Sequence, residues 1–252
     1  MAQLEYFQYA YMADNYGVLI HAPQSGETAC VDCGDAEATV NALKQKNWSL
    51  THIFATHHHA DHVAGLAQLK KQFNCHVTGP SGIAGVDQPV AGGETFTFGG
   101  TEVQTIHTPG HTKDMINYHL PAEKTVFTGD TLFALGCGRL FEGDAPMMWN
   151  SLNKLMTLPS DTIVYSSHEY TEANAAFAVT VDPQNKALAD RVKNITALRA
   201  KGEATVPGIM SEELATNPFL RAADPAIRQH LNMADATDAE VFAEIRSRKD
   251  NF

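Results

Sequence analysis

The chain has 252 residues, of which 44% are hydrophobic and 19% are charged. This length suits one or two domains, and this composition excludes a disordered, low-complexity or collagen-like chain. The formal net charge of −11 would repel phosphate over most of the surface, which argues against a nucleic-acid-binding protein.

Targeting signals and cysteines give expectations about the compartment. No Lys or Arg precedes Lys44, so neither the basic start of a secretory signal nor an Arg-rich transit peptide is found. No run approaches the ~18 continuous apolar residues of a membrane span. The four cysteines are too few to suggest a disulfide framework. We therefore expect a cytoplasmic protein without a membrane partner, and a monomer, because nothing in the sequence demands an oligomer.

Short β-like runs alternate with turn clusters through about residue 172. Residues 15–20 and 28–31 predict a hairpin, because the turn-rich segment 23–26 separates them. Further strands are expected at residues 53–56, 96–98, 103–107, 125–128 and 163–166.

Helical periodicity first appears after residue 56 and dominates from about residue 173. Apolar residues recur at helical spacing at positions 63, 66, 69 and 73, and again at 188, 192, 195 and 198. Residues 239–248 also predict a helix. Residues 1–172 carry 8 basic and 18 acidic side chains, whereas residues 173–252 carry 10 and 11. We therefore expect a strand-rich domain over residues 1–172 and a smaller all-α domain over residues 173–252.

A dense histidine cluster lies between the strand at 53–56 and the helix that follows. Four candidate ligands stand within six residues, at His57, His59, Asp61 and His62. Imidazole and carboxylate are ligands that Zn²⁺ or Fe²⁺ favours, and one ion needs three or four of them. The cluster therefore predicts more than one ion. The alternative is a polar loop with solvated histidines.

Three further candidate ligands follow expected strands in the same way. His111 follows the strand at 103–107, Asp130 follows the strand at 125–128, and His168 follows the strand at 163–166. The carboxyl ends of strands are where open α/β sheets gather ligands. An isolated His or Gly-Asp is more often a turn or a satisfied core residue, but three of them in order form a specific pattern.

These residues resemble the ligand pattern of the metallo-β-lactamase-fold hydrolases. The resemblance implies an α+β fold, an αββα sandwich with two metal ions at one sheet edge. His58 lies outside the pattern, and we expect it, like His52, His107 and His119, to have a packing or supporting role. By this resemblance the first ion is held by His57, His59 and His111, the second by Asp61, His62 and His168, and Asp130 bridges both.

Hydrolysis is the chemistry that two such ions favour. Two ions about 3.5–4 Å apart share a water and lower its pKa toward ~7, so that hydroxide forms at neutral pH. We expect Asp61 and Asp130 to orient this hydroxide as the catalytic carboxylates. Zinc is the expected metal, with iron and manganese as alternatives. Cys137 has no base at motif spacing, and the Cys30-x-x-Cys33 pair has no second pair, so these thiols are expected to be structural.

Further segments resemble one branch of this superfamily, the glyoxalase II or hydroxyacylglutathione hydrolase family. The resemblance spans essentially the whole chain and implies hydrolysis of an S-(2-hydroxyacyl)glutathione thioester, with S-D-lactoylglutathione as substrate. D-lactate and glutathione are then the products, in the second step of methylglyoxal degradation. The matching segments are residues 14–16, 136–143, 168–171, 217–221 and 246–250.

The resemblance also implies a glutathione site in the second half of the chain. Arg246 and Lys249 stand at i and i+3, on one helix face, and would bind the glycine carboxylate of glutathione. The alternative is a solvated basic helix end, favoured by the helix dipole. Phe141 stands where relatives often have tyrosine, so a hydroxyl contact is lost. The implied substrate contacts are Arg139, Leu140, Phe141, His168, Glu169, Tyr170, Arg246 and Lys249.

Two other functions remain open from the sequence. The first is another enzyme of the same fold, such as a mono-iron glutathione-persulfide dioxygenase, which would have a smaller second metal site and usually no helical tail. The second is a non-catalytic metal-binding module, which should have lost one or more ligands. All seven ligand positions and the tail are retained here.

Overall fold

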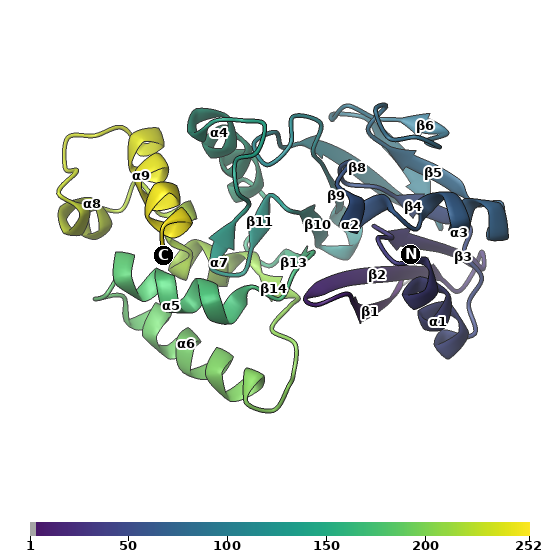
Figure 1. The fold of residues 1–252 in the computed structure, drawn as a ribbon, viewed down its shortest axis with the longest axis horizontal. Coiled ribbons are helices and arrows are strands. Elements are labelled where there is room, and N and C mark those ends of the chain that lie inside the picture. The colour runs from purple at the N-terminus through teal and green to yellow at the C-terminus, as the bar shows by residue number, and fades with distance from the viewer. Residues whose placement is uncertain (1–3) are drawn as a thin grey trace. The chain divides into compact units, whose positions relative to one another are not determined.

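The computed structural model describes residues 4–252 (Figure 1). The contacts between Cα atoms in space divide the chain into two compact units. Unit 1 comprises Met1–His107 and Asp114–Gly129, and unit 2 comprises Thr108–Lys113 and Asp130–Phe252.

The first sheet of unit 1 has six strands in the order β1-β2-β3-β4-β5-β6. The first three strands pair antiparallel, which confirms the expected hairpin, and β3 to β6 pair parallel. The strands are β1 (Glu5–Tyr11), β2 (Asn15–Ala22), β3 (Glu27–Val31), β4 (His52–Phe54), β5 (His76–Gly79) and β6 (Gln88–Pro89).

A second sheet of unit 1 contains four antiparallel neighbours in the order β7-β8-β9-β10. The strands expected at 96–98, 103–107 and 125–128 are all present, each slightly longer than predicted. The elements are β7 (Thr95–Phe98), β8 (Thr101–His107), β9 (Ile116–Leu120), the 3₁₀ turn η1 (Pro121–Glu123) and β10 (Thr125–Gly129).

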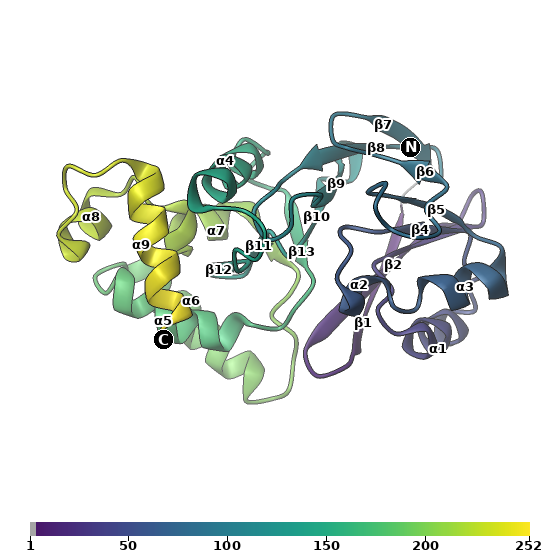
Figure 2. The same cartoon turned by 45° about the horizontal axis from the view of Figure 1, so that its top comes forward.

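Unit 1 is layered, with the first sheet packed on both faces. Helices α1 (Ala36–Lys46) and α3 (Leu66–Phe73) bury Leu43 and Leu69 against one face, in a core that includes Ile53. The other face packs on the second sheet through aromatic rings, with Phe54 5.3 Å from Tyr118 between centroids. Figure 2 shows α1 and α3 on one side of the first sheet and β7 and β8 on the other.

The helix expected after the first histidine cluster is broken into two pieces. It forms α2 (Ala60–Val63) and α3 (Leu66–Phe73), which are separated at Gly65. The loop around Cys33 approaches this point closely, because Gly65 N donates to Cys33 O at 2.8 Å. A Cβ at Gly65 would lie 2.5 Å from the same oxygen. Periodicity alone did not reveal the break, because it depends on a loop thirty residues upstream.

Unit 2 is mainly helical, with short strands. The strand expected at 163–166 has those bounds, and the apolar stripe from Leu188 lies on α6. Figure 1 shows α5 and α6 side by side. The elements are β11 (Leu132–Phe133), β12 (Gly136–Cys137), α4 (Ala145–Met156), β13 (Ile163–Ser166), α5 (Thr171–Val181), α6 (Lys186–Arg199), β14 (Gly208–Ile209), α7 (Met210–Thr216), η2 (Pro218–Leu220), α8 (Pro225–Leu231) and α9 (Asp238–Asp250).

The last helix, α9, is capped at its N-terminus by Thr237. The Thr237 side chain accepts from Glu240 N, and the Glu240 side chain accepts from Thr237 N, which is a capping box. Helix α9 packs against α4, where Trp149 and Phe242 have ring centroids 5.9 Å apart. Among residues 4–252, no helix has the length and apolar character needed to cross a membrane.

Candidate metal centre

The loop between β4 and α2 carries His57 and His59. Because the chain is neither strand nor helix from residue 55 to residue 59, these side chains need not alternate or follow a helical period. His57 is fully buried, and its Nδ1 lies 3.0 Å from Thr56 Oγ1. Its Nε2 lies 3.0 Å from His59 Nδ1. The loop therefore turns two imidazole nitrogens toward one point.

Asp61 and His62, on α2, form a second pair of donors in unit 1. His62 Nε2 lies 3.3 Å from Asp61 Oδ2. Asn15 Nδ2, at the start of β2, donates to the same carboxylate oxygen at 3.0 Å. The Asp61 carboxylate is thus oriented by strand β2 as well as by its own helix.

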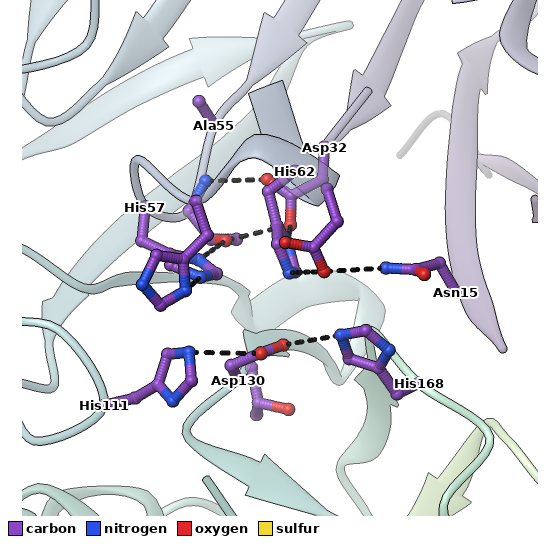
Figure 3. A network of polar contacts seen from close by, with 12 residues as sticks. Asn15, Asp32, Ala55, His57, His62, His111, Asp130 and His168 are labelled. Atoms are coloured by element: carbon purple, nitrogen blue, oxygen red, sulfur yellow. Dashed lines mark hydrogen bonds and ion pairs between the residues drawn. The ribbon is translucent and has the colours of Figure 1, made fainter. Parts of the chain in front are cut away.

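Asp32, at the end of β3, fixes this part of the site, and the sequence analysis did not find it. Its Oδ1 accepts from Thr56 N at 2.8 Å, and its Oδ2 accepts from Thr56 Oγ1 at 2.9 Å. The same Oδ2 lies 2.8 Å from His62 Nδ1, as Figure 3 shows. Because a carboxylate only accepts, His62 donates this hydrogen bond from Nδ1, and such a second contact orients a metal-binding histidine. The sequence feature that could have revealed Asp32 is its place directly after β3, the strand that pairs with β4.

Unit 2 brings His111, Asp130 and His168 together. His111 Nε2 lies 3.3 Å from Asp130 Oδ2, and His168 Nε2 lies 3.4 Å from Asp130 Oδ1. All three residues are buried. Figure 3 shows the Asp130 carboxylate between the two rings, with one oxygen toward each. The carboxylate therefore has the arrangement of a group that bridges two ions.

The spacing and support of these donors fit divalent metal ions. Two donors bound to one ion at about 2.0–2.1 Å and at tetrahedral angles lie about 3.3–3.4 Å apart. The His62–Asp61, His111–Asp130 and His168–Asp130 separations are 3.3, 3.3 and 3.4 Å. His111 is held from behind, because its Nδ1 donates to Arg139 O at 2.9 Å. Such second contacts orient metal-binding histidines.

His58 contacts an aspartate at the surface of unit 1. Its side chain is 41% exposed, and its Nδ1 lies 3.2 Å from Asp114 Oδ2. A protonated His58 therefore forms a surface ion pair, and its ring also packs edge-on against His59, with centroids 5.2 Å apart. His52, by contrast, packs edge-on against Phe98, with centroids 5.3 Å apart.

Comparison with known proteins identifies the family of this chain. Residues 15–91 and 80–168 match the metallo-beta-lactamase superfamily, and residues 169–252 match the family described as "Hydroxyacylglutathione hydrolase C-terminus". A hydroxyacylglutathione hydrolase of Rhizobium meliloti (strain 1021) is 53% identical over 256 residues and covers 100% of both chains. One from Brucella ovis is 53% identical over 99% of both chains.

The chain belongs to the hydroxyacylglutathione hydrolase family.

Solved structures agree with this fold. ETHE1 from Myxococcus xanthus superposes with a TM-score of 0.70 at 25% identity, covering 96% of this chain and 90% of that one. The BLEG-1 B3 metallo-beta-lactamase superposes with a TM-score of 0.66 at 22% identity, covering 86% of this chain and 99% of that one. The expected metallo-β-lactamase fold with a C-terminal helical part is confirmed. The family fold and the His/Asp clusters indicate a dinuclear metal site.

The family assignment also bears on the two other functions. The full-length relatives carry the name hydroxyacylglutathione hydrolase, which favours neither a persulfide dioxygenase nor a non-catalytic module. The expectation of a hydrolase is therefore confirmed at the level of the family.

Aromatic rings contact both donor histidines of unit 2. The Tyr170 ring stacks on the His168 ring, and Phe141 contacts the His111 ring edge-on at 5.2 Å between centroids. Phe141 is 63% exposed, and Tyr170 is 37% exposed. Both therefore offer ring surface to a ligand that approaches His111 and His168.

The Glu169 carboxylate forms hydrogen bonds with Thr205 in unit 2. Its Oε2 accepts from Thr205 N at 2.8 Å, and its Oε1 accepts from Thr205 Oγ1 at 2.6 Å. Arg199 Nη1 lies 3.6 Å from the same carboxylate. Both carboxylate oxygens of Glu169 thus bind Thr205 within unit 2, and the contact of Glu169 with substrate stays a prediction.

Arg246 and Lys249 share one face of α9, as their i, i+3 spacing in a helix predicted. Arg246 is buried, donates to Cys137 O at 2.9 Å and pairs with Asp250 at 2.9 Å. Lys249 Nζ donates to Ala173 O at 2.9 Å. Burial lowers the pKa of Lys249, and the nearby charges of Arg246 and Arg139 lower it further.

The cysteine thiols of this hydroxyacylglutathione hydrolase family member are poor nucleophiles, because burial keeps them protonated. Burial raises the pKa of Cys137 to about 11, although Arg246 lies beside it and acts in the opposite direction. Burial likewise raises the pKa of Cys30 to about 12. All four thiols are free and buried. They are neutral at physiological pH, in agreement with a structural role.

Proposed function

We propose that this chain hydrolyses the thioester of an S-(2-hydroxyacyl)glutathione, S-D-lactoylglutathione among them, to a 2-hydroxy acid and glutathione. The observation that carries this proposal is the Asp130 carboxylate, whose two oxygens contact two different buried histidines. A carboxylate in this arrangement can bridge two ions, and dinuclear sites serve hydrolysis. The names of the full-length relatives supply the substrate class.

We propose the ligand sets that the resemblance to metallo-β-lactamase-fold hydrolases implies. His57, His59 and His111 would hold one ion, and Asp61, His62 and His168 the other, with Asp130 shared. We propose zinc as the metal, with iron and manganese as the alternatives that elemental analysis separates. When bound, such ions act as Lewis acids toward a carbonyl oxygen and lower the pKa of water from 15.7 toward ~7.

The protein's own carboxylates would orient the attacking water. Asp61 and Asp130 accept hydrogen bonds from it, and Asn15 keeps Asp61 in place through its 3.0 Å contact. The leaving group is a thiolate whose conjugate thiol has a pKa of ~8.5, so departure requires no strong acid. The neutral thiol of Cys137 takes no part, because its pKa is raised to about 11.

The basic cluster of unit 2 would bind the carboxylates of glutathione. Arg139, Arg246 and Lys249 lie close enough for the two arginines to lower the pKa of Lys249. Three neighbouring cations repel one another, so an anion placed among them is favoured. Tyr170 would donate a further hydrogen bond through its hydroxyl group, and Phe141 would contact the peptide with its ring. Leu140, which is partly exposed, would add apolar surface. Residues 1–172 would then be the catalytic domain and residues 173–252 the glutathione-binding domain.

The four free cysteines also support a reducing compartment. We place the protein in the cytoplasm and expect it to act as a monomer. Fractionation of cells and sedimentation of the purified protein test these two expectations.

Elemental analysis combined with a thioesterase assay tests the proposed function. The purified protein should contain two divalent ions per chain and should cleave lactoylglutathione, releasing a thiol. Glutathione persulfide should cause no oxygen uptake. Protein with two ions that leaves every acyl-glutathione intact would overturn the substrate, and protein that binds no ion under replete conditions would overturn the mechanism.

A further inference from the structure

The β11–β12 hairpin connects two parts of the candidate metal centre within unit 2. It begins two residues after Asp130, and it ends two residues before Arg139, whose carbonyl accepts from His111 Nδ1. At its open end, Gly138 N donates to Thr131 O at 3.2 Å. A Cβ at Gly138 would lie 2.0 Å from Asp130 O. The hairpin is therefore packed directly against the backbone of Asp130 and is continuous with the segment that supports His111.

The tip of the hairpin has a strained backbone. Leu132 pairs with Cys137 and Phe133 with Gly136, so Ala134 and Leu135 alone form the loop. Leu135 has a φ of 56°, in the left-handed region that glycine and asparagine prefer. Its side chain is fully buried. Contacts from outside the hairpin must hold this conformation.

Glu213 and Asn217, from α7 and the residue after it, supply those contacts. Glu213 Oε2 accepts from Leu135 N at 3.0 Å and from Asn217 Nδ2 at 3.0 Å. Asn217 Nδ2 also lies 3.2 Å from Phe133 O and 3.1 Å from Gly136 O. One carboxylate and one amide thus hold the backbone on both strands of the hairpin.

Arg191, on α6, holds the other oxygen of Glu213. Arg191 Nη2 donates to Glu213 Oε1, and Nη1 donates to Thr216 Oγ1 at 2.8 Å. The two charged side chains are 6% and 2% exposed. A buried ion pair of this kind is weak evidence for stability but is often retained for specificity. Here the Glu213 carboxylate of the pair also accepts a hydrogen bond from Leu135 N, in the strained turn of the hairpin.

We propose that Glu213 is a positioning residue for the metal centre, which fixes the β11–β12 hairpin and through it Asp130 and His111. This inference rests on the proposed dinuclear site. Glutamine cannot replace Glu213, because the amide has one oxygen. If that oxygen accepts from Leu135 N, the NH₂ group faces Arg191; if it accepts from Arg191, the NH₂ group faces two other donors.

Glu213→Gln and Glu212→Gln form a matched pair for the test. Glu212 contacts the same guanidinium, with Arg191 Nε 3.3 Å from Glu212 Oε2, but its side chain is 45% exposed. The metal-loaded variants are titrated with a chelator, and their cobalt-substituted forms are compared by visible absorption. We expect Glu213→Gln to release its ions at a chelator concentration about 10-fold lower than the wild type requires. The visible absorption spectrum of its cobalt form should also differ from that of the wild type. Glu212→Gln should match the wild type in both.

Kinetics separate positioning from substrate binding. For Glu213→Gln, kcat for the acyl-glutathione should fall while KM stays within about twofold, and added zinc should restore part of kcat. Thermal unfolding of the metal-free proteins reports the structural cost alone. A folded Glu213→Gln variant with lower thermal stability but wild-type chelator response and cobalt spectrum would overturn the proposal.

If Glu213→Gln does not fold, Asn217→Ala is the second variant for the same test. It leaves the Arg191–Glu213 pair intact and removes the two carbonyl contacts on the hairpin, so it should show the same weakened ion retention. Wild-type retention in a folded Asn217→Ala variant would overturn the inference. If the wild type binds metal without cleaving thioesters, the proposed function fails while the chelator titration still decides the role of Glu213. If the wild type binds no metal, both are overturned.

Discussion

The Tyr170 ring lies parallel to the His168 ring, with centroids 4.6 Å apart and planes 3° apart. Phe133 contacts both rings edge-on, at 5.9 Å from His168 and 5.3 Å from Tyr170. An imidazole packed against two aromatic rings has few alternative rotamers. The orientation of His168 therefore depends on residues that do not themselves bind metal.

Replacing Tyr170 separates its ring from its hydroxyl group. Tyr170→Ala removes the stacking surface, so we expect kcat and ion retention to fall by about 10-fold. Tyr170→Phe keeps the ring and should raise only KM for the thioester. Steady-state kinetics and elemental analysis of both variants check this. Equal ion retention and kcat in the two variants would contradict a role for stacking.

Asp32→Asn should weaken the metal centre although Asp32 is not a proposed ligand. The Asp32 carboxylate accepts from Thr56 N, Thr56 Oγ1 and His62 Nδ1, and an amide would place hydrogens against one of these donors. We expect a loss of 10–100-fold in metal affinity or activity, as is typical for such supporting groups. Chelator titration measures it.

Asp35→Asn is the matched control for Asp32→Asn. Asp35 is the N-cap of α1 and accepts from Ala38 N, and asparagine caps a helix equally well. Metal affinity should be unchanged. If both variants lose metal equally, the effect comes from disturbing this region as a whole.

Loss of the Lys249 charge should raise KM for the thioester at alkaline pH. Burial, with Arg246 and Arg139 nearby, lowers its pKa from the ordinary 10.5. Above the lowered pKa the side chain is neutral and no longer attracts a carboxylate, so KM for the thioester should rise before pH 10.5 is reached. Lys249→Arg keeps its charge and should remove this rise, and Lys249→Ala should raise KM at all pH values without loss of metal. An unchanged KM profile in Lys249→Arg would rule out this assignment.

His119 should make the free energy of unfolding depend on mildly acid pH. Burial lowers the pKa of His119 below its ordinary 6.5, so the folded state favours the neutral ring. This contribution is fully present above pH 6.5 and is lost as the pH falls through the lowered folded pKa. Chemical denaturation of wild type and His119→Gln at pH 8 and pH 5.5 measures it. The variant should lose less stability on acidification, and an equal loss would contradict the prediction.

Local elements were predictable where their cause is local. The strand Ile163–Ser166 and the helix Lys186–Arg199 follow from apolar patterns that need no information from elsewhere. The break at Gly65 was not predictable, because a hydrogen bond to Cys33 O causes it. Patterns along the chain report which face a segment buries, but not which distant loop it meets.

The sequence by itself determined the chemistry of this protein: imidazole and carboxylate groups at the ends of strands, and basic residues at the last helix. Only the tertiary structure decided how these groups are held. Asp32 behind His62, Thr205 on Glu169 and Glu213 on the β11–β12 hairpin all join residues at least thirty positions apart. Their partners are set by the packing of separate elements, and a hydrogen bond requires atoms to meet within about 3 Å. No spacing along the chain encodes that distance.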